Sequence, residues 1–248
     1  REAKEIFYNK DFYNELDQNP YLLCFKNGVI DFKEKTFREG RAEDYVSFCT
    51  NVEYIPKDNE RRAQRVEQEV KTFMEQLFPE KELRRYMWEH LASTLIGTLD
   101  NQTFNMYFGS GRNGKSVLVD LMSKVLGDYK GTVPTSLITQ SRPTIGSTSS
   151  EIAQLRGVRY AVMQEPSKGD KINEGIMKEI TGGDPIQGRA LFKDTVTFVP
   201  QFKLVVCTNT LFEISSNDDG TWRRIRICDF LSKFVQKPFE DPLFPKDR

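Results

Sequence analysis

The sequence predicts an α/β fold with a mostly parallel sheet and helices on both faces. Short apolar segments typical of buried strands alternate with longer segments of helical periodicity. A glycine-rich run, GSGRNGKS at 109–116, lies between one such strand and one such helix. A strand, a glycine-rich turn and a helix in this order are typical of a loop that binds phosphate.

The composition, 38% hydrophobic and 29% charged over 248 residues, is that of a soluble globular protein. Basic and acidic residues number 36 each, so any contact with nucleic acid must be local. No apolar segment is long enough to cross a bilayer, and the chain starts with neither an initiator methionine nor a signal peptide. We expect an intracellular piece of a longer protein, with no membrane partner. The cysteines form no C-x-x-C pair and are expected to be reduced thiols, without zinc or disulfides: Cys24, Cys49, Cys207 and Cys228.

Residues 1–58 are predicted to form a small N-terminal lobe. In NPYLLCFKNGVIDF two short strands flank Asn27-Gly28, a dipeptide typical of hairpin turns. Residues 59–100 are predicted to be helical, with a first helix that ends at Pro79 and a second, KELRRYMWEHLASTLIG, that ends at Gly97. The apolar face of the first helix is expected to consist of Val66, Val70, Phe73, Met74, Leu77 and Phe78.

Residues 101–232 are predicted to contain the sheet. FNMYF forms its first strand, and SVLVDLMSKVLG forms the helix that follows the glycine run. Later strands are expected in VRYAVM, KLVVC and RRIRICDF. The polar segment 139–150 is predicted to be a mobile loop, and 233–248 a short tail. The apolar face of the helix is expected to consist of Val117, Leu118, Leu121, Met122, Val125 and Leu126.

The glycine run matches G-x-x-x-x-G-K-[ST], in which backbone amides surround phosphates. Lys115 is expected to contact the terminal phosphates and the Ser116 hydroxyl a Mg²⁺ ion. The alternative is a glycine-rich turn with a surface lysine. The predicted ligand is ATP with Mg²⁺, bound by Gly109, Ser110, Gly111, Arg112, Asn113, Gly114, Lys115, Ser116 and Val117.

Two further polar residues follow apolar strands. Glu165, after VRYAVM, is expected to bind Mg²⁺ through water and to help position the attacking water. It stands alone, because Gln164 takes the place of the first acid of the usual pair. Asn209, after KLVVC, is expected to orient water or to sense the γ-phosphate. The alternatives are a solvated glutamate at a strand end and a turn-forming asparagine.

Between these residues, IQGRALF and TVTFV are predicted to form a hairpin that turns at Lys193-Asp194. A hairpin is not needed to bind a nucleotide, and Phe192 and Lys193 at its tip are suited to contact a nucleic-acid backbone. The alternative is a surface hairpin with an incidental lysine.

Arg223 and Arg224 precede the last strand. In a head-to-tail ring an arginine here is expected to reach the neighbour's nucleotide and to accelerate hydrolysis. The alternative is a solvated or salt-bridged pair.

Taken in order, GSGRNGKS, AVMQEP, KEITGGDPIQGRALFKD, FVPQFKLVVCTN and WRRIRICDF resemble the motifs of superfamily 3 helicases. The resemblance is strongest to the viral, phage and plasmid primase–helicase branch that includes the poxvirus-type nucleoside triphosphatase, and it covers roughly 60–230. It implies a modified AAA+ (P-loop) sheet, a homohexameric ring with nucleotide sites between subunits, and hairpins that grip single-stranded DNA in a central channel. It also implies a primase domain upstream.

Motif by motif, the resemblance implies catalytic roles for Lys115, Glu165, Asn209 and Arg224, with Arg224 a better match than Arg223 to the family's arginine finger. It places Lys193, Phe192 and Arg189 on the DNA-binding hairpin. The family's extra motif falls on Lys178, Gly183, Asp184 and Arg189.

The predicted function is therefore that of an ATP-dependent DNA helicase motor in a viral or phage replication primase–helicase. If the protein is viral, we expect it in the host cytoplasm or a replication compartment. One alternative is a small-molecule phosphotransferase, active as a monomer and insensitive to DNA. Another is a nucleotide-gated, DNA-binding ring with little hydrolysis, since only Glu165 remains of the acidic pair.

Overall fold

A computed structural model describes residues 9, 12–56, 61–139, 149–166, 169–215 and 218–237. Most of the segment 139–150 and of the tail 233–248, for which we predicted a loop and a short end, lies outside this range. None of the helices in these ranges combines the length and the apolar character needed to cross a membrane.

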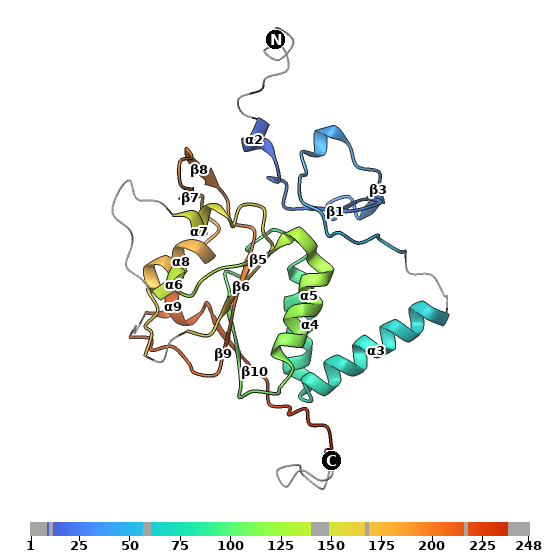
Figure 1. Cartoon of the computed structure of the whole chain (residues 1–248), viewed down its shortest axis with the longest axis vertical. Helices are drawn as coiled ribbons and strands as arrows, with labels where there is room; N and C mark the ends of the chain where they lie inside the picture. Colours follow the sequence, from blue (N-terminus) through green and yellow to red (C-terminus); the bar gives the residue numbers. More distant parts are fainter. Residues whose placement is uncertain are drawn as a thin grey trace.

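A five-stranded parallel sheet confirms the predicted α/β fold (Figure 1). Its order is β10 (Ile225–Asp229), β4 (Phe104–Phe108), β9 (Lys203–Thr208), β6 (Tyr160–Gln164) and β5 (Lys130–Thr132). Four of these strands were predicted, whereas β5 was missed. The letters of β5, Lys-Gly-Thr, carry no apolar signal, and the strand follows directly on the short 3₁₀ turn η2 (Gly127–Tyr129).

Successive residues of β4 point to opposite faces of the sheet, as a strand requires. Phe104 and Met106 pack with α8 (Glu174–Thr181), near the short helix α6 (Ser136–Thr139). Tyr107 packs with α5 (Lys115–Leu126), α4 (Lys81–Ser93) and the end of α3 (Arg61–Leu77). The sheet thus has helices on both faces, as predicted (Figure 1).

Two predicted helix faces were partly wrong. Val117 and Val125 of α5 are exposed, and Val119 is buried in their place beside the correctly predicted Leu118. Val66 of α3 is also exposed, because α3 meets the sheet only through its last turns and extends away from the rest of the molecule (Figure 1).

The predicted hairpin is present as β7 (Ile186–Arg189) paired antiparallel with β8 (Thr195–Phe198). Its first strand is shorter than the predicted IQGRALF, and the connection spans 190–194 in place of the tight turn predicted at Lys193-Asp194. It forms its own two-stranded sheet and packs against the short helix α7 (Ser150–Ala153). Another short helix, α9 (Asp219–Trp222), leads into β10.

The N-terminal lobe is a three-stranded antiparallel sheet of β1 (Leu22–Phe25), β2 (Gly28–Asp31) and β3 (Thr36–Arg38). It is preceded by α2 (Phe12–Glu15) and followed by the 3₁₀ turn η1 (Ala42–Asp44). The first turn is Lys26-Asn27, one residue earlier than predicted. Gly28 instead opens β2 at φ +154°, where a Cβ would lie 2.6 Å from the Arg38 carbonyl oxygen of β3.

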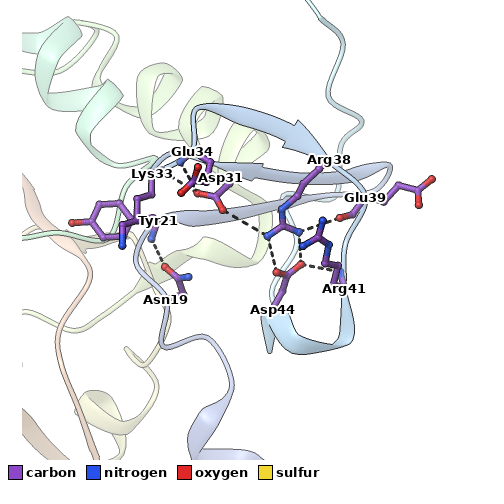
Figure 2. Close-up of polar contacts among 9 residues, drawn as sticks. All are labelled: Asn19, Tyr21, Asp31, Lys33, Glu34, Arg38, Glu39, Arg41 and Asp44. Carbon is purple, nitrogen blue, oxygen red and sulfur yellow. Dashed lines mark hydrogen bonds and ion pairs between the residues drawn. The ribbon is translucent and has the colours of Figure 1, made fainter.

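Arg38 holds the end of this lobe together (Figure 2). Its guanidinium forms a bidentate pair with Asp44, at 2.7 and 2.8 Å, and lies 3.7 Å from Asp31. The hydrogen bonds from Arg38 and from the Arg41 amide lower the pKa of Asp44. These ion pairs therefore connect β2, β3 and η1 within the lobe.

The lobe is tied to the central sheet by a buried arginine. The Arg159 guanidinium donates to the carbonyl oxygens of Pro20 and Leu22, at 2.7 and 3.0 Å, and to that of Leu95 in the core, at 3.2 Å. Asn19 supplies a further carbonyl. Burial lowers the pKa of Arg159 to about 10, still far above neutral pH, so a full positive charge joins the two parts.

Candidate functional site

The glycine run forms a loop between β4 and α5. Gly109 at φ +152° and Gly114 at φ +83° adopt conformations that favour glycine. A Cβ on Gly114 would overlap Leu77 Cδ2, and one on Gly109 would lie 2.7 Å from the Phe230 carbonyl oxygen. The loop leads into the N-terminus of α5, whose first amides have no partner within the helix. This backbone has the form of an anion cradle.

The loop residues divide into exposed and buried ones. Ser110, Gly111, Arg112, Ser116 and Val117 are exposed and accessible to a ligand. Asn113 is buried and donates to the Phe230 carbonyl oxygen at 3.4 Å. Its side chain therefore holds the loop in place.

Lys115 is buried at the start of α5 and points back across the loop. Its ammonium group donates to the Gly109 carbonyl oxygen and to Asn209 Oδ1, the latter at 3.2 Å. Burial lowers the pKa of Lys115 below its ordinary value. A desolvated lysine with only neutral oxygen acceptors is suited to receive a phosphate anion.

Asn209 connects Lys115 to Glu165. Its Nδ2 group donates to Glu165 Oε1 at 3.0 Å, while its Oδ1 accepts from Lys115. Asn209 follows β9 and Glu165 follows β6, and these strands are neighbours in the sheet. The structure therefore brings together the three polar residues predicted from the strand ends.

The residues present fit a magnesium ion. The exposed Ser116 hydroxyl and Glu165 carboxylate are hard oxygen donors beside the phosphate cradle. Across the described ranges, no group of three or more histidine, cysteine, aspartate or glutamate residues is arranged to hold a metal. Few protein ligands suffice for Mg²⁺, since it keeps several waters and shares phosphate oxygens.

The two arginines lie at the other end of the sheet. Because Ile225 pairs with Phe104 at the start of β4, Arg223 and Arg224 are on the amino edge, opposite the glycine loop. Neither contributes to the Lys115 cluster of its own chain.

The arginines also differ in exposure. Arg224 is buried and donates to the Gly220 carbonyl oxygen and to Gln102 Oε1, at 2.6 and 3.0 Å. Arg223 is exposed and donates to the same Gln102 oxygen at 2.9 Å. Gln102 in turn donates to the Gly182 carbonyl oxygen at 2.8 Å. Sequence reasoning missed Gln102, because a single polar residue in a loop gives no signal.

The tip of the β7–β8 hairpin is exposed and partly apolar. Phe192 is 94% exposed at φ +58°, and Leu191 is 62% exposed. Lys193 is exposed, and its carbonyl oxygen accepts from Arg189 Nε at 3.2 Å. Arg189 therefore braces the turn that presents Phe192 and Lys193.

The remaining motif residues connect helices. Lys178 of α8 pairs with Asp218, the N-cap of α9. Gly183 at φ +86° ends the α8 segment just before the hairpin. These residues link the hairpin, α8 and the arginine-bearing segment.

Two family models match this chain. The one described as D5 N terminal like matches residues 1–79, and a family of unknown function, DUF5906, matches residues 107–224.

Relatives occur in large DNA viruses. The proposed helicase L207/L206 of Acanthamoeba polyphaga mimivirus is 40% identical over 236 residues, covering 95% of this chain and 24% of that protein. The proposed helicase 121R of Invertebrate iridescent virus 3 is 34% identical, with coverage of 94% and 25%. The proposed primase C962R of African swine fever virus is 28% identical, with coverage of 100% and 26%. The chain spans about a quarter of the length of these relatives.

Among solved structures, the apo C-terminal region of NrS-1 has a similar fold. Its A form aligns with a TM-score of 0.51 at 13% identity and covers 71% of this chain and 39% of that one. A second apo structure, of residues 305–718, gives 0.51 at 12% identity, with coverage of 71% and 40%. This chain is therefore similar to the D5 N terminal like model in residues 1–79 and, over most of its length, to about a quarter of the length of viral proteins named as helicases and primases.

Proposed function

We propose that this chain is the ATP-hydrolysing motor of a D5-like replication primase–helicase, with a superfamily 3 helicase core of the modified AAA+ type. The observation that carries the proposal is the hydrogen-bonded series Lys115, Asn209 and Glu165 beside the glycine loop. It combines a cation for phosphate, a carboxylate for water and an amide that holds both. Since the chain spans about a quarter of its relatives, a primase domain is assigned to the rest of the protein.

In this proposal the loop amides and Lys115 bind the triphosphate of ATP. Glu165, held by Asn209, orients a water molecule towards the γ-phosphorus. The new P–O bond forms as the bond to the β–γ bridging oxygen breaks, which releases ADP and phosphate. Bound Mg²⁺, held by Ser116 and through water by Glu165, would neutralise charge on the phosphate oxygens.

The site is proposed to be completed by an arginine of the next subunit in a hexameric ring. The motif match favours Arg224 for this role. Its burial and its bonds to Gly220 and Gln102 favour a role in holding the segment instead. The exposed Arg223 on the same segment is the better candidate to contact a neighbour.

The hairpin is proposed to contact single-stranded DNA in the ring channel. Lys193 would neutralise a phosphate, and the almost fully exposed Phe192 ring would lie against a sugar or base. Arg189 supports the turn through the Lys193 carbonyl oxygen. For a viral protein of this kind, the host cytoplasm or a replication compartment is the proposed location.

ATP turnover, measured over a range of protein concentrations with and without single-stranded DNA, tests the function. We expect turnover that rises with assembly and with DNA, and that Lys115→Ala abolishes. A phosphotransferase would be insensitive to both variables, and a nucleotide-gated ring would bind ATP without turnover. Wild-type turnover by Lys115→Ala would overturn the proposal.

Mixing two inactive variants tests the shared site. Lys115→Ala retains its arginines and Arg223→Ala retains its glycine loop, so mixed rings contain some complete sites. We expect the mixture to regain turnover that neither variant has alone. A mixture that recovers nothing contradicts a contribution of Arg223 from the neighbouring subunit, and Arg224→Ala is compared in the same assay.

A further inference from the structure

A segment after the last strand lies beside the glycine loop. This strap, Phe230–Phe234, is bound to the loop at both ends: the Phe230 amide donates to the Phe108 carbonyl oxygen at 2.8 Å, and the Phe234 amide donates to that of Arg112 at 2.7 Å. Between them, Ser232 Oγ donates to the Gln76 carbonyl oxygen of α3 at 2.6 Å. The strap therefore has a defined position beside the loop.

Phe234 places an aromatic ring at the start of α5. A Cβ on Gly114, the residue just before Lys115, would lie 3.2 Å from Phe234 Cε2. The ring is nevertheless 41% exposed, unlike Leu77, which also lies next to that Cβ position and is completely buried. Part of the ring thus packs on the loop and part is open to solvent.

A second apolar side chain is exposed on the same first turn of α5. Val117, three residues after Gly114, is 56% exposed, whereas the next residue, Leu118, is completely buried. Exposed apolar groups beside a polar phosphate cradle suit a ligand with a charged end and a flat, apolar end. A nucleoside triphosphate has this construction, because its base lies a ribose away from its phosphates.

We propose that Phe234 is the stacking platform for the nucleobase of the bound triphosphate. The assignment rests on the proposed function, since it requires the phosphates to lie in the glycine loop. It adds that the strap contacts the base, which the phosphate loop does not reach. Stacking on one ring accepts any base, so affinity follows the stacking area of the base, with purines bound more tightly than pyrimidines.

The test compares two ligands, Mg·ATP and Mg·tripolyphosphate, which share phosphates but not the base. Binding to the wild-type chain and to Phe234→Ala is measured by titration calorimetry. We expect Phe234→Ala to weaken ATP binding by about 5- to 150-fold, the range for loss of one stacked base. Tripolyphosphate binding should change by less than about twofold, within the small effect of a surface substitution. Phe234→Trp should retain ATP binding, and Phe12→Ala, at a phenylalanine of the N-terminal lobe that is 49% exposed, is the matched control.

Equal loss of both ligands in Phe234→Ala, with Phe234→Trp equally weak, would mean that the ring only supports the loop and would overturn the proposal. Unchanged ATP affinity would overturn it as well. Lys115→Ala separates a failure of the base assignment from a failure of the proposed function, because it should weaken the binding of both ligands. If Lys115→Ala binds both normally, the phosphate assignment itself fails.

Discussion

At the scale of single residues, Asn209 joins the lysine and the single carboxylate of the candidate site. Its amide accepts from Lys115 and donates to Glu165 at the same time. An aspartate here would accept from the lysine but would repel Glu165. The neutral amide therefore keeps the cation and the carboxylate in one arrangement, and Gln164 adds no second negative charge.

His90 predicts a pH dependence of stability. The imidazole is buried, lies 2.9 Å from the Tyr107 hydroxyl, and has a pKa lowered by burial to about 4. Between pH 6.5 and 4 the unfolded chain takes up this proton and the folded chain does not, so stability falls as the pH falls. The loss approaches about 3 kcal/mol near pH 4, from about 1.4 kcal/mol per pKa unit.

Urea unfolding at pH 7.5 and pH 5 measures this dependence. His90→Gln, which has no titrating ring, should lose less stability than the wild type between the two values. An identical loss in both proteins would show that His90 does not cause it.

The arginine pair shows a property that the sequence does not predict, namely which of two adjacent arginines is buried. Arg223 and Arg224 are adjacent and chemically equal, so only tertiary contacts decide that Arg224 is buried against Gln102 and Gly220. By contrast, Lys115, Glu165 and Asn209 were predictable together, because the carboxyl ends of parallel strands meet at one edge of a sheet.

At the scale of elements, the glycine loop predicts that replacing glycine by alanine has different effects at two of its positions. Gly114→Ala places a Cβ at φ +83° and into Leu77, and should cost about 2 kcal/mol or more together with the loss of ATP binding. Gly111→Ala is the matched control, since its Cβ would meet nothing within 4 Å. It should change stability by less than about 0.5 kcal/mol. Thermal unfolding and ATP titration measure the stability and the ATP binding of the two variants. Equal losses in Gly114→Ala and Gly111→Ala would contradict the assigned loop geometry.

Prediction succeeded for elements whose own residues are mostly apolar. It failed where pairing or packing with a neighbouring element determines the structure. The strands β4, β6, β9 and β10 consist mostly of apolar residues, whereas the three residues of β5 pair only because β6 lies alongside. The faces of α3 and α5 were assigned from periodicity, which cannot say how much of a helix meets the sheet. The β7–β8 hairpin was predicted, since its turn separates two alternating segments.

At the scale of the molecule, Arg159 predicts that the lobe and the core depend on each other. Arg159→Met would leave the carbonyl oxygens of Leu22 and Leu95 without their Arg159 donor, while that of Pro20 keeps the Gly97 amide, at a cost of about 3 kcal/mol or more. Arg156→Ala, at a half-buried arginine that donates to the Leu16 carbonyl oxygen and stacks on Tyr13, should cost about 1 kcal/mol or less. Urea unfolding measures both, and an equally small cost for Arg159→Met would refute the dependence.

The strap and α3 add a second connection. The Ser232 hydroxyl, after the last strand, donates to the Gln76 carbonyl oxygen in the last turn of α3. Segments far apart in sequence thus surround the glycine loop. Its shape depends on the whole chain and not on its motif alone.

The buried Arg159 limits how far the protein can be truncated from its N-terminal side. A fragment that starts at the helical segment near residue 59 would remove the carbonyl oxygens of Asn19, Pro20 and Leu22, and with them most acceptors of a buried charge. Gln201 would also lose its acceptors at Asp17 and Gln18. Expression boundaries for this protein should therefore lie upstream of Asp17, although the glycine loop begins more than ninety residues later (109 − 17 = 92).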